Sequence, residues 1–254
     1  MEQMYKALKL VPVEHIDLHE TFEQKRLEKT KQSIEAEQIM RHPVLVTQTQ
    51  SGRYMVIDGV HRFTSLKALG CRVVPVQDIN ETQYSISTWN HKVAIGQWWE
   101  TLRQDNSLPW TTEIKNATPF ITMCKGYDEQ YLYVEDLGEQ KLEAWSKVVA
   151  SYSQTYDVER IAQSDNTCVS NQHILMKYQP LGFQEIETIV NRGETVPAGV
   201  TRFNISGRCL NLQVPLAILK EQSELNRNVK WNEFLEGKMD SVRCYSEKVY
   251  LVEQ

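Results

Sequence analysis

A strand-to-helix junction in the first third of the chain concentrates groups suited to phosphate chemistry. The stretch VIDGVHRFTSLKALG (56–70) places Asp58, His61 and Arg62 around Gly59. Free N–H groups and the positive dipole end at a helix start attract anions, and arginine donates two parallel hydrogen bonds to phosphate. Aspartate can hold Mg²⁺ between phosphates, and glycine permits close ligand approach or a positive φ. If the helix begins by Asp58, the i, i+3, i+4 spacing lets these side chains converge on one ligand.

The same junction also has a purely structural interpretation. Asp58 can cap the helix and pair with Arg62, which leaves His61 as an ordinary surface residue. A short D-G-x-H-R string is not specific, so the surrounding elements must decide between the two interpretations.

Around the junction, segments in which apolar and polar residues alternate and segments rich in helix-forming residues predict a unit with the order strand, helix, strand, strand, helix, strand. Glycine at position 70 is typical of a helix end. The expected elements are a strand at 10–18, a helix at 21–38, two strands within 43–59 joined by a turn at 51–52, a helix at 60–69 and a strand at 71–79.

Downstream, the segment 87–104 predicts a helix whose Trp89, Val93 and Trp98 face inward. We expect a mixed α/β (α+β) fold, with an N-terminal nucleotide-binding domain at 1–100 and a second α+β domain at 101–254. The second domain mixes strand-like pieces with helical ones; the strand-like pieces are 130–137 and 248–254, and the helical ones are 141–152 and 215–225.

Composition limits the class of protein. The chain has 254 residues, 41% hydrophobic content and a formal charge of −5, which argues against a protein that mainly coats nucleic acid. No stretch approaches the apolar length of a membrane span and no signal peptide is evident, so we expect a cytoplasmic protein without a membrane partner. The cysteines lack CxxC pairs and predict buried, reduced thiols: Cys71, Cys124, Cys168, Cys209 and Cys244. Apart from His15 and His19, which lie four residues apart, the histidines show no metal-ligand spacing, and no motif indicates haem.

The order of elements from about Leu10 to Ile79 resembles the N-terminal domain of the ParB and sulfiredoxin superfamily. The segments that carry the resemblance are VPVEHIDL, SIEAEQIMRHPVLVTQ and YMVIDGVHRFTSLKALGCRVVPVQ. Sulfiredoxin-like proteins carry a reactive cysteine where this chain has Val60, and valine cannot perform that reaction. ParB proteins carry a G-E-R-R box and a basic recognition helix, neither of which is evident here. A ParB-like DNA-binding regulator of a siderophore cluster nevertheless stays as the alternative function.

A third branch of the superfamily, the ParB-like free L-serine kinases, resembles more of the chain. TWNHKV (88–93) and VPAGVTRFNISGRCLNLQVPL (196–216) are similar to distal segments of those kinases. The chain looks most like the branch that feeds 2,3-diaminopropionate and staphyloferrin B siderophore synthesis. The resemblance implies phosphorylation of L-serine to O-phospho-L-serine with ATP, or ADP, as donor and Mg²⁺ as cofactor. The oligomeric state is not readable from the sequence.

The resemblance also implies roles for individual residues. Glu20, at the join between the first strand and the first helix, matches the catalytic base and contacts the serine. Asp58 is the catalytic magnesium ligand. The nucleotide phosphates are held by Asp58, Gly59, Val60, His61 and Arg62, and the serine by Glu20, Trp89, Thr201 and Arg202.

Plainer interpretations stand beside these roles. Glu20 can be a helix-start carboxylate favoured by the dipole. Arg202 can form a structural ion pair, and Trp89 can belong to the core. The kinases often have histidine where this chain has Phe203, which puts one substrate contact in doubt.

Overall fold

The computed structural model describes residues 2–134, 138–165 and 170–244, and its contacts divide the chain into two compact units. Unit 1 comprises Met1–Ile16, Gln24–Asn80 and Gly207–Gln254, and unit 2 comprises Asp17–Glu23 and Glu81–Ser206. The chain therefore leaves unit 1 twice and returns to it twice. These units are defined by contacts rather than by ligands, so the functional division into 1–100 and 101–254 stays a prediction.

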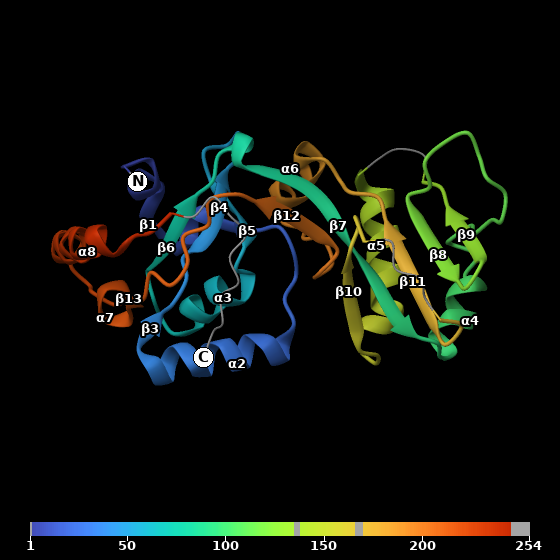
Figure 1. The fold of residues 1–254 in the computed structure, drawn as a ribbon, viewed down its shortest axis with the longest axis horizontal. Coiled ribbons are helices and arrows are strands. Elements are labelled where there is room, and N and C mark those ends of the chain that lie inside the picture. Colours follow the sequence, from blue (N-terminus) through green and yellow to red (C-terminus); the bar gives the residue numbers. More distant parts are fainter. Residues whose placement is uncertain (1, 135–137, 166–169, 245–254) are drawn as a thin grey trace. The chain divides into compact units, whose positions relative to one another are not determined.

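Unit 1 is built on a sheet whose strands run in the order β1 (Leu8–Pro12), β6 (Val73–Asp78), β4 (Val44–Gln48) and β5 (Tyr54–Asp58). β4 and β6 are parallel, and each contains at least four consecutive buried residues, as expected of a strand covered on both faces. Helices α2 (Gln24–Glu37) and α3 (Val60–Ala68) lie on the same side of the sheet (Figure 1). The short helix α1 (Glu2–Ala7) precedes β1.

The C-terminal part of the described chain completes unit 1. Strand β13 (Val214–Pro215) pairs with β3 (Ile39–Met40), and helices α7 (Leu216–Leu219) and α8 (Glu224–Lys238) follow. Strand β2 (Ile16–Leu18) carries the chain from unit 1 into unit 2.

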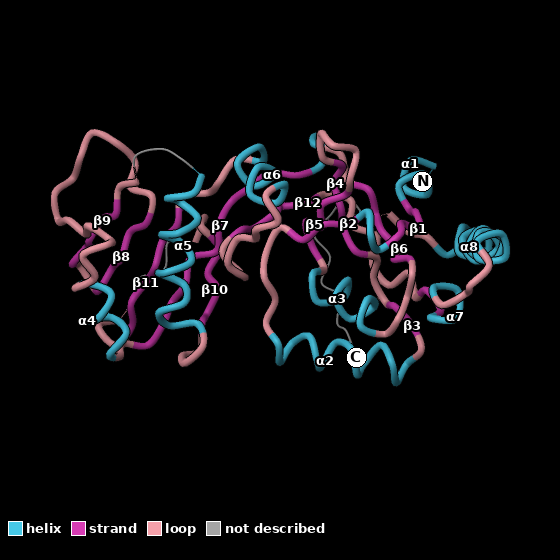
Figure 2. The backbone as a smooth tube through the Cα atoms, turned by 180° about the vertical axis from the view of Figure 1, so that it is seen from behind, coloured by secondary structure: helices cyan, strands magenta, loops and turns pink. Residues whose placement is uncertain are grey.

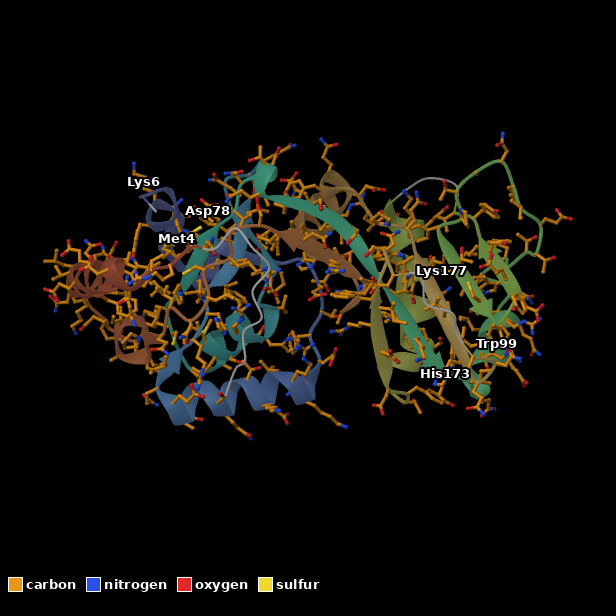
Figure 3. The ribbon with its side chains drawn as sticks, viewed as in Figure 1. Met4, Lys6, Asp78, Trp99, His173 and Lys177 are labelled. Carbon is orange, nitrogen blue, oxygen red and sulfur yellow. The ribbon has the colours of Figure 1, made fainter. Side chains whose placement is uncertain are left out.

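Unit 2 is organised around the long strand β7 (Tyr84–Ala94). The first half of β7 pairs with β12 (Thr201–Ile205) and the second half with β10 (Val158–Ala162), while β11 (His173–Tyr178) occupies the other edge. The sheet continues through β8 (Ile121–Lys125) to β9 (Asp128–Leu132). Figure 2 shows helix α5 (Gly138–Ser153) along this sheet, and Figure 3 labels His173 and Lys177 on β11. The remaining helices are α4 (Gln97–Arg103) and α6 (Phe183–Asn191).

The mixed α/β class is confirmed, and so are the predicted elements of residues 21–79, with small shifts of their ends. The single strand predicted at 10–18 is wrong, because β1 ends at Pro12, a 3₁₀ helix follows at Val13–His15, and β2 begins only at Ile16. The helix predicted at 87–104 is wrong, because 84–94 is strand β7 and only 97–103 is helical. The helix predicted at 215–225 divides into α7 and the start of α8. The strand predicted at 130–137 ends at Leu132, and the one at 248–254 lies outside the described residues.

The described cysteines are all free thiols, and their burial differs. Cys71 and Cys124 are buried as predicted, whereas Cys209 is half-buried and Cys244 is exposed, which corrects the prediction for those two. Burial raises the pKa of Cys71 and Cys209, and burial together with the hydrogen bond to Glu129 raises the pKa of Cys124 to about 12. Cys168 lies outside the described residues. Among the helices described, none combines the length and apolar character that crossing a membrane requires.

Candidate active site

In unit 1, a glycine turn connects β5 to α3. Asp58 is the last residue of β5, Gly59 has φ 100°, and α3 begins at Val60 rather than at Asp58. A Cβ atom at Gly59 would lie 2.8 Å from an Arg62 guanidinium nitrogen, so both the backbone angle and the space favour glycine. The prediction that Gly59 permits a positive φ is confirmed. The first intrahelical bond runs from the N–H of Phe63 to the oxygen of Gly59, which leaves the preceding N–H groups without partners inside the helix.

Arg62 fastens this turn to the loop before β4. Its Nη1 donates to the carbonyl oxygens of Pro43 (2.7 Å) and His42 (3.2 Å), and its Nη2 donates to Asp58 Oδ2 (3.2 Å). The predicted Asp58–Arg62 pair is therefore present. The alternative that Asp58 caps the helix is wrong, because no side chain caps α3 at Gly59.

Val60 and His61 occupy the first helical turn in different ways. The Val60 side chain is buried in the core, so this residue can offer a ligand only its backbone N–H. His61 is half-buried on the same turn. The sequence interpretation of these two residues as phosphate contacts stays a prediction.

Arg208 is a second cation at Asp58, and the sequence analysis missed it. Its Nη1 lies 2.5 Å from Asp58 Oδ2. The backbone on both sides of Arg208 is clamped by the buried amide of Gln77, which donates to the oxygen of Gly207 and accepts from the N–H of Cys209, both at 2.7 Å. Because 150 residues separate Arg208 from Asp58 in the sequence, no local spacing could have indicated this contact.

The carboxylate of Asp58 is suited to share a magnesium ion with phosphates. Both guanidinium groups contact Oδ2, and in the described part of the chain no residue donates a hydrogen bond to Oδ1. Mg²⁺ is commonly bound by one or two carboxylates plus substrate phosphates and water. A single available carboxylate oxygen therefore fits the ion.

In unit 2, Glu20 is held against the loop that precedes β12. The backbone on either side of Glu20 bonds to Val196: the Val196 N–H donates to His19 (2.8 Å), and its oxygen accepts from Thr21 (3.0 Å). Glu20 Oε2 accepts from the N–H of Gly199 at 2.9 Å. One carboxylate oxygen is thereby oriented, while Oε1 accepts no hydrogen bond from the described residues.

Trp89 and Arg202 form a cation–π pair beside this loop. The guanidinium carbon of Arg202 lies 4.1 Å from the centroid of the Trp89 ring, and the backbone N–H of Trp89 donates to the carbonyl oxygen of Val200 at 2.8 Å. Trp89 is half-buried rather than a full core residue. Within the described ranges no carboxylate pairs with Arg202, so the structural ion pair considered for it is absent there.

Thr201 carries a polar atom that the described structure does not satisfy. The residue is 7% exposed, and its Oγ1 is buried without a hydrogen-bond partner among the described residues. Leaving such a hydroxyl unpaired costs about 1–3 kcal/mol. A polar ligand atom at this position would remove that cost.

Phe203 replaces a polar contact with an aromatic one. The residue is 5% exposed, and its ring packs edge-on against His19 (5.2 Å between centroids) and Tyr84 (5.4 Å). The departure from the kinase pattern is therefore accommodated in the core of unit 2.

The structure brings the predicted residues together in two groups. Asp58, Gly59, His61 and Arg62 share the turn in unit 1 at which β5 ends and α3 begins. In unit 2, the segment 199–201 connects the others, because Gly199 bonds to Glu20, Val200 bonds to Trp89, and Thr201 precedes Arg202.

A buried histidine behind this segment makes unit 2 sensitive to acid. The pKa of His91 is lowered from 6.5 to about 4, chiefly by burial and also by the charge of Arg160, whereas the bond to Gly199 and the charge of Glu23 act in the opposite direction. The unfolded chain binds this proton below pH 6.5 and the folded chain only below about 4. The folded state therefore keeps its full stability above pH 6.5, where His91 is neutral in both states, and loses stability as the pH falls towards 4.

We expect the free energy of unfolding to fall by roughly 2–3 kcal/mol between pH 7.5 and 4.5 through this residue alone. Urea unfolding at the two pH values should show a larger loss for the unmodified protein than for His91→Gln, which has no imidazole to protonate. Equal losses would contradict the assignment.

Comparisons with known proteins agree on one family. The model of the ParB N-terminal domain matches residues 3–87. The chain is 66% identical over 254 residues to the ATP-dependent L-serine kinase SbnI of Staphylococcus aureus, with 100% of both chains covered. An ATP-dependent L-serine kinase of Staphylothermus marinus is 30% identical over 133 residues, which is 51% of this chain and 48% of the relative.

Solved structures give the same picture. SbnI from Staphylococcus aureus with a C-terminal truncation matches with a TM-score of 0.89 at 66% identity, covering 94% of this chain and 99% of that chain. A free serine kinase in complex with AMP matches with a TM-score of 0.69 at 17% identity, covering 84% of this chain and 93% of that chain, which shows a shared fold. The predicted ParB-like N-terminal domain is confirmed.

Proposed function

This chain belongs to the family of ATP-dependent L-serine kinases, and we propose that it transfers the γ-phosphoryl group of ATP to the hydroxyl of free L-serine. The product is O-phospho-L-serine, and the nucleotide leaves as ADP. The full-length identity of 66% to a named serine kinase is the observation that carries this assignment. These relatives favour the kinase over the alternative of a DNA-binding regulator.

Glu20 acts as the general base. A serine hydroxyl is a poor nucleophile near neutral pH, so a carboxylate should accept its proton as the oxygen attacks the γ-phosphorus. The bond from Gly199 to Oε2 orients the carboxylate and leaves Oε1 to receive the proton. Glu20 lies four residues before the start of α2 at Gln24, so it is not a carboxylate of the first helical turn.

The serine is recognised by side chains beside the same loop. Arg202 supplies a cation for the substrate carboxylate, and its stacking on Trp89 fixes the guanidinium plane. The unsatisfied Thr201 hydroxyl offers a further hydrogen bond to the amino acid. Trp89 forms an apolar wall that limits the size of the acceptor.

The nucleotide phosphates are bound at the start of α3. The backbone N–H groups of Val60, His61 and Arg62 lie in the first turn of α3, at the positive end of the helix dipole, and Gly59 allows a phosphate to approach the backbone. Arg62 and Arg208 add positive charge at Asp58. Asp58 is the residue that would hold Mg²⁺, and the ion would supply charge neutralisation at the phosphates.

The place of the reaction in metabolism follows from the resemblance to the siderophore-associated branch. O-phospho-L-serine would feed the synthesis of 2,3-diaminopropionate for staphyloferrin B. Because ATP and free serine are both intracellular metabolites, we place the enzyme in the cytoplasm.

Phosphorus NMR of a mixture of protein, nucleotide and Mg²⁺ tests this function directly. Parallel samples should contain L-serine, L-threonine or no acceptor, each with ATP or ADP as donor. We expect a phosphomonoester signal with L-serine and ATP, and none without an acceptor. Nucleotide loss that does not depend on serine would contradict the proposed reaction.

A further inference from the structure

A chain of buried polar groups crosses the core of unit 2 behind the Glu20 loop. His91, which is 2% exposed, contacts Tyr152 OH through Nδ1 and the carbonyl oxygen of Gly199 through Nε2, each at 2.8 Å. Tyr152 OH in turn contacts Tyr178 OH. None of these three side chains has a role in the function proposed above.

The donor and acceptor of each hydrogen bond among these buried groups follow from the carbonyl group of Gly199. A carbonyl oxygen can only accept, so Nε2 of His91 carries the proton and donates to Gly199. In the neutral imidazole Nδ1 then accepts from Tyr152, whose oxygen accepts from Tyr178. Burial raises the pKa of both tyrosines and lowers that of His91, so all three groups stay neutral at physiological pH and keep these directions.

Gly199 connects these buried groups to the proposed catalytic base, Glu20. Its carbonyl oxygen is fixed by His91, and its N–H donates to Glu20 Oε2. Gly199 has φ 76°, and a Cβ atom there would collide with the Arg160 guanidinium, which itself pairs with Glu23 at 2.5 Å. Both polar groups of the Gly199 backbone are therefore hydrogen-bonded, and the Arg160 guanidinium lies against its Cα.

We propose that His91 is a positioning residue for catalysis, which fixes the Gly199 backbone and through it the Glu20 carboxylate. This inference rests on the role of Glu20 in the proposed function. His91 does not exchange protons with the substrate, because both ring nitrogens are engaged and the ring is buried. Its contribution is geometric, since small displacements of a catalytic group can cost up to about a hundredfold in rate.

Two substitutions at position 91 separate the two contacts of the imidazole. In His91→Gln the amide nitrogen can occupy the place of Nε2 and donate to Gly199. In His91→Asn the amide is nearer the place of Nδ1 and can meet only Tyr152. We expect kcat to stay within about fivefold for the glutamine variant and to fall 10- to 100-fold for the asparagine variant. The KM for ATP should change less than twofold in both.

A double-mutant cycle with Glu20→Gln distinguishes positioning from general destabilisation. If His91 acts through Glu20, His91→Asn should lower the residual rate of Glu20→Gln less than twofold, because residues acting as a unit are not additive. Tyr152→Phe repeats the test without altering position 91, and Tyr156→Phe is its control, because that hydroxyl lies against Gly96 instead.

The outcomes separate the two claims. A fully active Glu20→Gln enzyme overturns the proposed base and leaves His91 nothing to position. If Glu20→Gln is strongly impaired, two results would overturn the positioning role alone. One is that the rate losses of Glu20→Gln and His91→Asn multiply in the double variant, and the other is that His91→Gln and His91→Asn have equal rates. Rescue by glutamine together with non-additivity supports it.

Discussion

Glu20→Gln lowers the turnover of serine phosphorylation by about 10²- to 10⁴-fold, the usual contribution of a general base. Glutamine can still accept the hydrogen bond from Gly199, so the loop keeps its anchor while the proton acceptor is lost. Nucleotide affinity should change less than twofold, because the phosphates are assigned to the turn after β5. Steady-state kinetics with serine and a nucleotide-binding titration measure the two quantities.

Glu143→Gln is the matched control for this prediction. Glu143 is an exposed glutamate on α5 of unit 2 and pairs with Lys147 at 2.9 Å, so its substitution removes a carboxylate of the same size that has no part in fixing Gly199. We expect its turnover to remain within threefold of the unmodified enzyme. Comparable losses in the two glutamine variants would show that the loss of any carboxylate from unit 2 lowers activity and would contradict the role of Glu20 as the base.

Asp58→Asn produces the second large loss, about 10²-fold or more in kcat, with a higher Mg²⁺ concentration needed for half-maximal activity. The substitution removes the negative charge and replaces one carboxylate oxygen with an NH₂ group. Because Arg62 and Arg208 donate to the oxygen that remains, the NH₂ group takes the place of the oxygen assigned to the ion. A purely structural ion pair predicts a different result, namely lower stability without a change in magnesium dependence. Magnesium titrations at fixed ATP and thermal unfolding separate the two.

Asp78→Asn controls for the loss of an aspartate at a strand end. Asp78 closes β6 as Asp58 closes β5, is labelled in Figure 3, and pairs with Lys9 at 2.7 Å. Its substitution should leave the magnesium requirement unchanged. If Asp58→Asn shows the same magnesium dependence as this control, the ion is held elsewhere.

The local part of unit 1 could be predicted because its information is local. Helices α2 and α3 show helix-forming composition, and the glycines at positions 59 and 70 mark the turns around α3. The pairing of Asp58 with Arg62 needs a separation of only four residues. Such signals are complete within a short window of sequence.

Strand β7 could not be predicted from its own residues. Only Trp89 and Val93, four residues apart, fall at helical spacing, because Trp98 would lie on the opposite face of a helix. The hydrogen bonds that make 84–94 a strand come from β10, β11 and β12. Those partners lie more than sixty residues away. Tertiary pairing therefore overrode the local pattern.

The missed site residues share this cause. Arg208 reaches Asp58 across 150 residues, and His91 reaches Gly199 across 108. Neither contact leaves a motif in the sequence. The unpaired Thr201 hydroxyl is likewise visible only once its surroundings are known.

The clamp around Arg208 also has a consequence for biosynthesis. Gln77 leaves the ribosome 130 residues before Gly207, so at 5–20 residues per second its buried amide waits roughly 7–26 s for that partner. During translation, the nascent first unit lacks both the clamp and the second arginine, and a chaperone would encounter it in that incomplete form.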